Sequence, residues 1–253
     1  MIETVVVETD KIKKLNNPVL IVGLPGIGLI GQVVGRYLVK ELKAAKIASL
    51  YSHHFPHQVF MTKKGGMRLI KNSFYLHRAR KRDLVIVVGD VQALSSVGQY
   101  EVAGKILEFC KKHKVRQLVT VGGYSTGKIS EQRKIFAVAT EDKLKDKFKK
   151  YGVVFGEAKG SIVGAAGLIP TLGKIEGMEG ICLMGETHGG YVDTIAAREI
   201  VKLLAVYLGI SVNLKRIDER AKKSEKIMKK IEDEIKKSME TEYGSSRTVS
   251  YIR

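Results

Sequence analysis

The sequence predicts an α/β fold, in which helices cover both faces of a mostly parallel sheet to give a three-layer sandwich. Short runs of apolar, mostly β-branched residues alternate along the chain with segments whose apolar residues recur at helical spacing. Turn residues, above all glycine, separate these segments. In a sheet of this kind, binding chemistry concentrates at the carboxyl ends of the strands.

The first half of the chain opens with a short strand, TVVVE, and a turn at Asn16-Asn17-Pro18. The apolar run at 19–23 predicts a buried strand that enters a glycine loop, and apolar residues at helical spacing over 27–42 predict a helix after it. The remaining elements are strands at 46–51 and 84–89, a helix at 97–113, and two alternating segments, 57–62 and 73–79, that suggest a hairpin around Lys63-Lys64-Gly65-Gly66.

The second half continues the alternation. Predicted here are strands at 117–121, 135–140 and 181–186, a short strand within 152–157, and helices at 141–152 and 193–208. Gly152 and Gly209 end the two helices as C-cap glycines. Residues 161–180 are expected to form a glycine-rich packed segment.

Residues 214–239 differ from the body, because their apolar positions recur in steps of three and four while charges fill most other positions. The seam positions are Leu214, Ile217, Ala221, Ser224, Met228, Ile231, Ile235 and Ser238. Such a helix either packs along the body by a narrow stripe or projects and pairs with a neighbour, and we favour the second. We divide the chain into an α/β core domain (1–212), a protruding or self-associating charged helix (213–240) and a flexible partner-binding tail (241–253).

The composition argues against several classes of protein. Of 253 residues, 44% are hydrophobic, enough for a core, but no apolar run could span a bilayer. Acidic residues interrupt the apolar N-terminal stretch, so we expect no signal peptide and a cytoplasmic location. The net charge of +18 is spread along the chain without a nucleic-acid motif, so no specific nucleic-acid partner is expected. Cys110 and Cys182 lie in apolar segments and are expected to be buried and reduced.

The glycine loop contains the pattern GxGxxG at Gly26–Gly31, which is typical of dinucleotide sites. Such a site needs an acidic residue after the next strand, but the sequence there is SLYSHH; no Gly-Lys-Ser/Thr of a phosphate loop follows either. We interpret the glycines as a tight strand-to-helix turn. Nucleotide or nucleoside binding at Gly26–Gly31, with acids near Asp90 and Glu186, is the alternative function.

A nucleophile elbow is the second candidate motif. The segment GYSTG matches GxSxG around Ser125, with Glu186 and His188 downstream in the order of a hydrolase triad. A short polar link follows instead of the long helix that an elbow requires. We therefore predict no catalytic residue.

The loop histidines and the acidic residue before the last core helix are two further candidates for a chemical role. His53, His54 and His57 share a loop, but no Cys or carboxylate stands in ligand spacing beside them, so we interpret them as polar loop histidines and assign no metal ligand. Asp193 follows GETHGGYV and is interpreted as the N-cap of the last core helix, with Thr194 as the alternative cap. No cofactor is predicted.

Five segments, taken in order over roughly residues 15–210, resemble the archaeal proteasome-assembly-chaperone family. They are NPVLIVGLPGIGLIGQVVGRYLV, VIVVGDVQ, VTVGGYSTG, GSIVGAAGLIPTLG and ICLMGETHGGYVDTIAAREIVKLL. The resemblance implies a fold like that of purine nucleoside phosphorylases but no catalysis. It implies a scaffold that binds proteasome α subunits and helps them assemble, and a homo-oligomer such as a ring of five subunits.

Some members of that family end in a hydrophobic residue, Tyr and one further residue, and this tail inserts between neighbouring α subunits. Here the chain departs from the pattern, because Tyr251 is third from the end and Ser250 precedes it. Three alternatives stay open: the tail binds a variant pocket, folds back on its own oligomer, or needs a second assembly factor. The residues we assign to partner contact are Tyr251, Ile252 and Arg253 in the tail and Met228, Ile231 and Ile235 on the seam.

Overall fold

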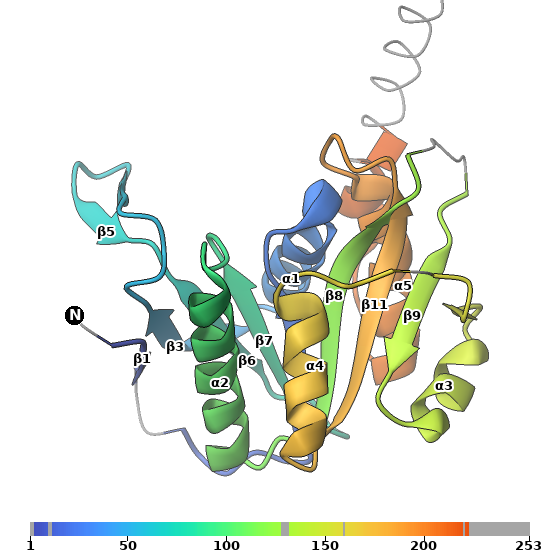
Figure 1. The fold of residues 1–253 in the computed structure, drawn as a ribbon, viewed down its shortest axis with the longest axis horizontal. Coiled ribbons are helices and arrows are strands. Elements are labelled where there is room, and N and C mark those ends of the chain that lie inside the picture. Colours follow the sequence, from blue (N-terminus) through green and yellow to red (C-terminus); the bar gives the residue numbers. More distant parts are fainter. Residues whose placement is uncertain (1–2, 10–11, 128–131, 159, 220, 223–253) are drawn as a thin grey trace, which may run out of the picture.

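The computed structural model describes residues 3–9, 12–127, 132–158, 160–219 and 221–222 (Figure 1). Nine strands of this described chain form one sheet. In spatial order they are β1 (Val5–Glu8), β3 (Ala45–Tyr51), β6 (Asn72–His77), β7 (Leu84–Gly89), β2 (Val19–Gly23), β8 (Gln117–Ser125), β11 (Glu179–Thr187), β9 (Ile135–Ala139) and β10 (Val154–Phe155).

The sheet is parallel at its centre, antiparallel pairs flank this centre on both sides, and the edge pair β9–β10 is parallel again. Strands β7, β2, β8 and β11 run parallel, whereas β1, β3, β6 and β7 are joined by antiparallel pairs, as are β11 and β9. The predicted parallel sheet is therefore confirmed for the central strands, and the sheet as a whole is mixed. Two antiparallel steps separate β3 from β7, so the carboxyl ends of both strands lie at the same edge.

Helices cover both faces, which confirms the three-layer prediction. In Figure 1, α2 (Ser96–Lys112) and α4 (Ala165–Ile175) lie in front of the sheet, and α1 (Ile30–Glu41) and α5 (Thr194–Leu208) lie behind it. Helix α3 (Asp142–Lys149) contributes Leu144 and Phe148 to the same apolar core as α1 and α5. The opposite core lies between the sheet and helices α2 and α4.

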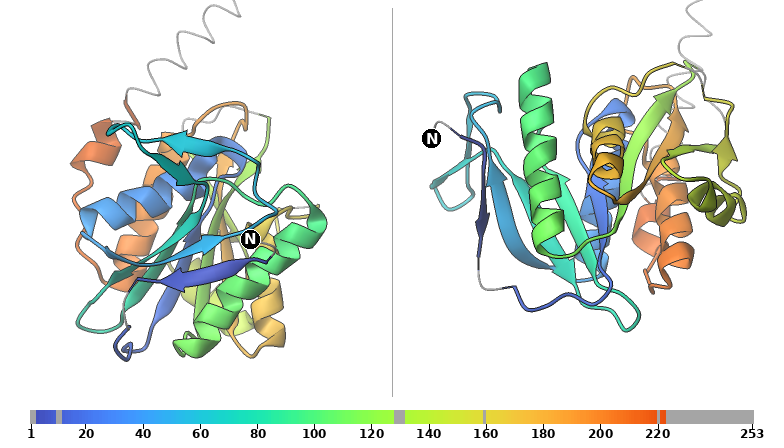
Figure 2. Two further views of the ribbon diagram at one scale, coloured as in Figure 1. Left: turned by 90° about the vertical axis from the view of Figure 1, so that its left-hand side faces the viewer. Right: turned by 60° about the horizontal axis from the view of Figure 1, so that its bottom comes forward.

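Two segments differ from the prediction. The glycine-rich stretch predicted as a packed segment contains a regular helix, α4, which has Pro170 inside it. The predicted hairpin forms between β4 (Val59–Met61) and β5 (Met67–Leu69), whereas the second alternating segment is strand β6 of the main sheet. This β4–β5 hairpin projects beyond the sheet in Figure 1 and faces the viewer in the left view of Figure 2.

The segment after α5 returns to the body. Residues 215–219 and 221–222 are helical, and Ile217 and Ala221 are buried at 0% and 1% exposure. Ile217 joins the core of α1 and α5, and the Tyr37 hydroxyl donates to the carbonyl oxygen of Asn213. The seam therefore begins as a stripe packed on the body, and its positions from Ser224 onward lie outside the described residues.

Two smaller expectations can be compared with the structure. Cys110 and Cys182 are free and buried, as predicted, and burial raises the pKa of both thiols. No helix within the described ranges is both long and apolar enough to cross a membrane.

Candidate functional site

The glycine loop turns from β2 into α1 through a single 3-10 turn, Ile27–Leu29, in which Gly28 has φ 62°. A Cβ on Gly31 would collide with the carbonyl oxygen of Val121 in β8 and lie 2.8 Å from that of Leu24. A Cβ on Gly23 would collide with the carbonyl oxygen of Gly31. These glycines allow α1 to lie directly on the sheet, which confirms the interpretation as a tight strand-to-helix turn.

A cavity of about 420 Å³ opens beside this loop, at the carboxyl ends of β2 and β8. The chain leaves β2 towards β3, β6 and β7 on one side and reaches β8 on the other, so this is a topological switch point, where α/β sheets bind ligands. Gly26 and Ile27 of the loop, Ser125 of β8 and Ala165 of α4 are among its lining residues. None of the lining residues within the described part of the chain is charged.

Gln92 joins the two sides of the cavity mouth. Its Nε2 donates to the carbonyl oxygen of Pro25 at 2.5 Å, and its Oε1 accepts from the backbone N–H of Ala165 at 3.0 Å. The first N–H groups of a helix have no partner within the helix, and Gln92 accepts from one of them at the start of α4. This N–H is therefore not available to bind an anion. Sequence reasoning did not assign a role to Gln92; its only signal was its place in the segment VIVVGDVQ.

The acids named for nucleotide binding do not line this cavity. Asp90 accepts two hydrogen bonds from Arg68, at 2.5 and 3.1 Å, and one from the backbone N–H of Lys71 at 3.2 Å. The hydrogen bond to Asp90 raises the pKa of the Arg68 guanidinium. Glu186 accepts from the backbone N–H of Lys134 at 3.1 Å. Asp90 thus anchors the β4–β5 hairpin, and Glu186 joins neighbouring strands.

The Ser125 hydroxyl, the candidate nucleophile of the GxSxG motif, is engaged by the backbone. Ser125 is the last residue of β8, and its hydroxyl donates at 2.8 Å to the backbone carbonyl of His188. The His188 ring stacks on the Tyr191 ring, with centroids 5.9 Å apart and planes inclined by 15°. The serine is thus bonded to the backbone of His188 while the imidazole packs elsewhere.

Asp193 is the N-cap of α5, as predicted, because its Oδ1 accepts from the backbone N–H of Ala196 at 2.9 Å. Its Oδ2 also accepts from Arg133 Nε at 3.1 Å, and both side chains are only 1% exposed. Arg133 Nη2 donates to the Tyr191 hydroxyl at 3.1 Å. This buried ion pair ties the start of β9 to the start of α5, and its arginine lay in a polar link with no sequence signal.

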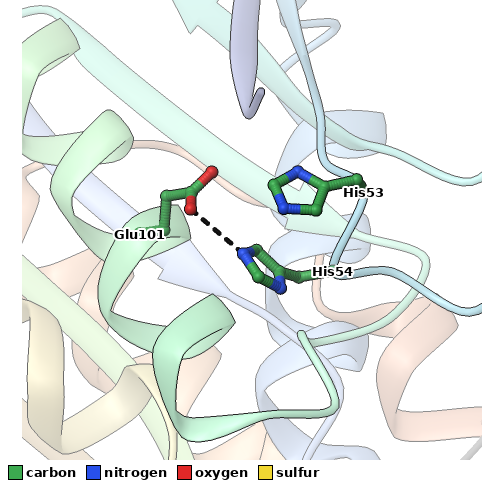
Figure 3. A group of neighbouring side chains, drawn as sticks. All are labelled: His53, His54 and Glu101. Carbon is green, nitrogen blue, oxygen red and sulfur yellow. Dashed lines mark hydrogen bonds and ion pairs between the residues drawn. The ribbon is translucent and has the colours of Figure 1, made fainter. Parts of the chain in front are cut away.

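The loop histidines divide into two groups. His53 and His54 lie against Glu101 of α2 (Figure 3), and the three form the one group of potential metal-ligating side chains among the described residues. His57 is not a member of that group. Glu101 is 47 positions from His54, so no local spacing could have indicated it.

Comparison with known proteins assigns the chain to a family. Residues 20–232 match the sequence profile of the PAC2 family. The chain belongs to the PAC2 family. One relative, the uncharacterized protein MJ1210 of Methanocaldococcus jannaschii, is 34% identical to this chain, and the alignment covers 100% of this chain and 98% of MJ1210.

Two solved structures show how far the PAC2 fold is shared. Pyrococcus furiosus PbaB, described as an archaeal proteasome activator, is 39% identical with a TM-score of 0.86, over 92% of this chain and 100% of that one. Pyrococcus furiosus PbaA, described as an archaeal homolog of proteasome-assembly chaperone, has a TM-score of 0.76 at 22% identity, over 97% of this chain and 100% of that one. The likeness to PbaA shows the fold alone.

The partner-contact residues assigned from the sequence of this PAC2 chain lie outside the described residues. They are Met228, Ile231, Ile235, Tyr251, Ile252 and Arg253. Their roles stay predictions.

Proposed function

We propose that this PAC2 chain is a non-enzymatic proteasome assembly chaperone or adaptor. It binds proteasome α subunits, or a second assembly factor, through an oligomeric body and its C-terminal segments. The observation that carries the proposal is the 39% identity to PbaB, a proteasome activator, over nearly the whole chain at a TM-score of 0.86. Binding to proteasome subunits is the step that either assembly or activation would require of this protein.

The hydrogen bonds that the candidate catalytic groups make within the protein support a non-catalytic role. The Ser125 hydroxyl is bonded to a backbone carbonyl, and the acids near the glycine loop are bonded to Arg68 and to backbone. We further propose that the core has a nucleoside-phosphorylase-like architecture. The proposed place of action is the cytoplasm.

The proposed homo-oligomer, a ring that we expect to contain about five subunits, needs an apolar contact surface. The β4–β5 hairpin offers one, because Met61 and Met67 are 90% and 78% exposed and Val59, Phe60 and Leu69 are also exposed. A two-stranded hairpin is marginally stable alone, and apolar residues on it gain stability by packing against another surface. We propose a second copy of this chain as that surface.

Capture of proteasome α subunits from the same organism tests the proposed function. We expect immobilised full-length protein to retain α subunits and a chain truncated after Gly244 to retain at least tenfold less. The same samples are then assayed for assembly of α rings and for stimulation of peptidase activity, which separates a chaperone from an activator. Equal capture by both chains would place the contact on the body or the seam, and capture by neither would contradict direct binding.

Nucleotide or nucleoside binding is the second candidate function, and the cavity at the switch point favours it. A ligand at 100 times its Kd would add about 2.7 kcal/mol to the free energy of unfolding. We would therefore measure thermal unfolding with adenine and nicotinamide nucleotides and with free nucleosides. Because none of the described lining residues is charged, we expect nucleosides to shift Tm more than their phosphates. No shift with any of them would exclude this function.

A further inference from the structure

His53, His54 and Glu101 form a compact group at the carboxyl edge of the sheet (Figure 3). The two histidines follow β3, and Glu101 lies on α2, which follows β7. Each residue offers one ligand atom, and these atoms all lie within 4.8 Å of one another. His54 Nε2 and Glu101 Oε2 are 3.0 Å apart, and the two imidazole rings have centroids 3.9 Å apart.

The surrounding structure holds these side chains from several sides. Glu101 Oε1 accepts from the backbone N–H of Thr4 at 3.1 Å, which leaves Oε2 directed at the histidines. The backbone N–H of His54 donates to Ser52 Oγ at 3.1 Å, and Ser52 Oγ shares a hydrogen bond of 2.7 Å with Thr4 Oγ1. Three chain segments therefore meet at the group, and the carboxylate has the kind of hydrogen-bonded support that orients metal ligands.

Gly98 brings α2 close enough for this contact. A Cβ on Gly98 would collide with the Cβ of His54, so only glycine permits the helix to pass directly under the histidine loop.

We propose that His53, His54 and Glu101 bind one divalent transition-metal ion of the zinc class. Two imidazoles and a carboxylate are ligands that zinc and its neighbours accept, whereas magnesium and calcium prefer oxygen alone. Ligand atoms around zinc lie roughly 3.4 Å apart in tetrahedral geometry, for bonds of about 2.1 Å. The observed separations of up to 4.8 Å would have to shorten on binding, and the exposed position of His53 leaves room for its side chain to rotate.

Three protein ligands leave a fourth position open to solvent on the His53 side. His53 is exposed, whereas the His54 and Glu101 side chains are 18% and 33% exposed. The ion therefore has an entry path and keeps a water or an external ligand. Because its ligands come from the loop after β3 and from α2, a bound ion would cross-link these two parts of the fold.

A plain ion pair between His54 and Glu101 is the competing explanation. Replacement of His53 distinguishes this explanation from a metal site. An ion pair needs only the 3.0 Å contact between His54 and Glu101, so replacing exposed His53 would change nothing. A metal site loses one of its three ligands. His57, an exposed histidine in the same loop but outside the group, provides the matched control.

The experiment is titration of tag-free, EDTA-treated full-length protein with Zn²⁺ by calorimetry, and with Co²⁺ by visible absorption. We expect one Zn²⁺ to bind per chain and the Tm to rise when Zn²⁺ is added. The visible absorption of bound Co²⁺ should be that of an ion with fewer than six ligands. His53→Ala should weaken Zn²⁺ binding at least tenfold and abolish the Tm rise, while its Tm without metal stays that of the wild type. His57→Ala should bind Zn²⁺ within twofold of the wild type.

Glu101→Gln provides a second variant, because glutamine keeps the shape and an acceptor for Thr4 but removes the charge. We expect at least a tenfold loss of Zn²⁺ affinity here as well. Absence of saturable binding to the wild type would overturn the proposal. Equal losses in His53→Ala and His57→Ala would also overturn it, because they would indicate unspecific binding to surface histidines.

Discussion

Gly31 shows how one missing side chain positions the first helix of the core. It lies in the first turn of α1, where glycine lowers helix stability by about 1 kcal/mol relative to alanine. That cost is offset because its Cα faces two backbone carbonyls, those of Val121 and Leu24, which cannot move independently of their strands. The helix can therefore lie on the sheet at backbone distance.

Replacement of Gly31 by alanine should destabilise the protein in spite of the better helix propensity. We expect Gly31→Ala to lower the free energy of unfolding by about 2–4 kcal/mol, because the Cβ displaces α1 from β8. Urea denaturation followed by circular dichroism measures this change.

Gly104 supplies the matched control for this substitution. It lies inside α2, and a Cβ there meets nothing within 4 Å. Gly104→Ala should therefore raise the free energy of unfolding by about 0.5–1 kcal/mol. If both variants gained stability, close contact between α1 and the sheet would not be the reason for Gly31.

At the scale of elements, α4 is a helix that its own sequence disfavours. Pro170 has no N–H, so the carbonyl of Ala166, four residues earlier, loses its helical partner. Thr120 of β8 replaces that partner, because its hydroxyl donates to the Ala166 carbonyl at 2.5 Å. The strand beneath the helix thus completes the hydrogen bonding that proline interrupts.

Thr120→Val should destabilise the protein by about 1–3 kcal/mol, because a near-isosteric methyl leaves the Ala166 carbonyl without a donor. Thr171→Val is the control, since the exposed Thr171 hydroxyl bonds only to the carbonyl of Gly167 in the same helix. We expect it to change stability by less than about 0.5 kcal/mol. Equal effects of both substitutions, measured by thermal and urea unfolding, would contradict a special role for Thr120.

At the scale of the whole molecule, the β4–β5 hairpin is an appendage held by few contacts. Arg68 lies with its guanidinium 4.4 Å from the centre of the Phe60 ring and also binds Asp90 of the body. This anchor fixes the hairpin while its methionines stay exposed. Such an arrangement suits an arm that reaches a neighbouring subunit.

Charged residues on the arm should therefore reduce self-association. If the proposed oligomer forms through the arm, Met61→Glu combined with Met67→Glu should convert it to smaller species at micromolar concentration, measured by sedimentation velocity. Ile175→Glu is the control, because Ile175 is 79% exposed but lies at the end of α4. An unchanged mass for the double variant, with unchanged circular dichroism, would move the subunit contact elsewhere.

The sequence by itself determined those features of this protein that depend on residues close together in the chain. The strand–glycine loop–helix unit, the cap formed by Asp193 and the burial of both cysteines all depend on residues close in the chain and were confirmed. The seam at Leu214, Ile217 and Ala221 is equally visible in the sequence. The sequence left packing along the body as the less favoured of two alternatives, whereas these three positions do pack on the body.

Tertiary structure decided what depends on residues far apart in the chain. Thr120 and Gln92 each bond a backbone group of helix α4. Glu101 meets His53 and His54 only because β3 and β7 end at the same edge of a mixed sheet. None of these contacts has a periodicity or spacing along the chain. Strand order decides which side chains meet at one edge of the sheet. Strand order cannot be derived from the pattern of a single sequence.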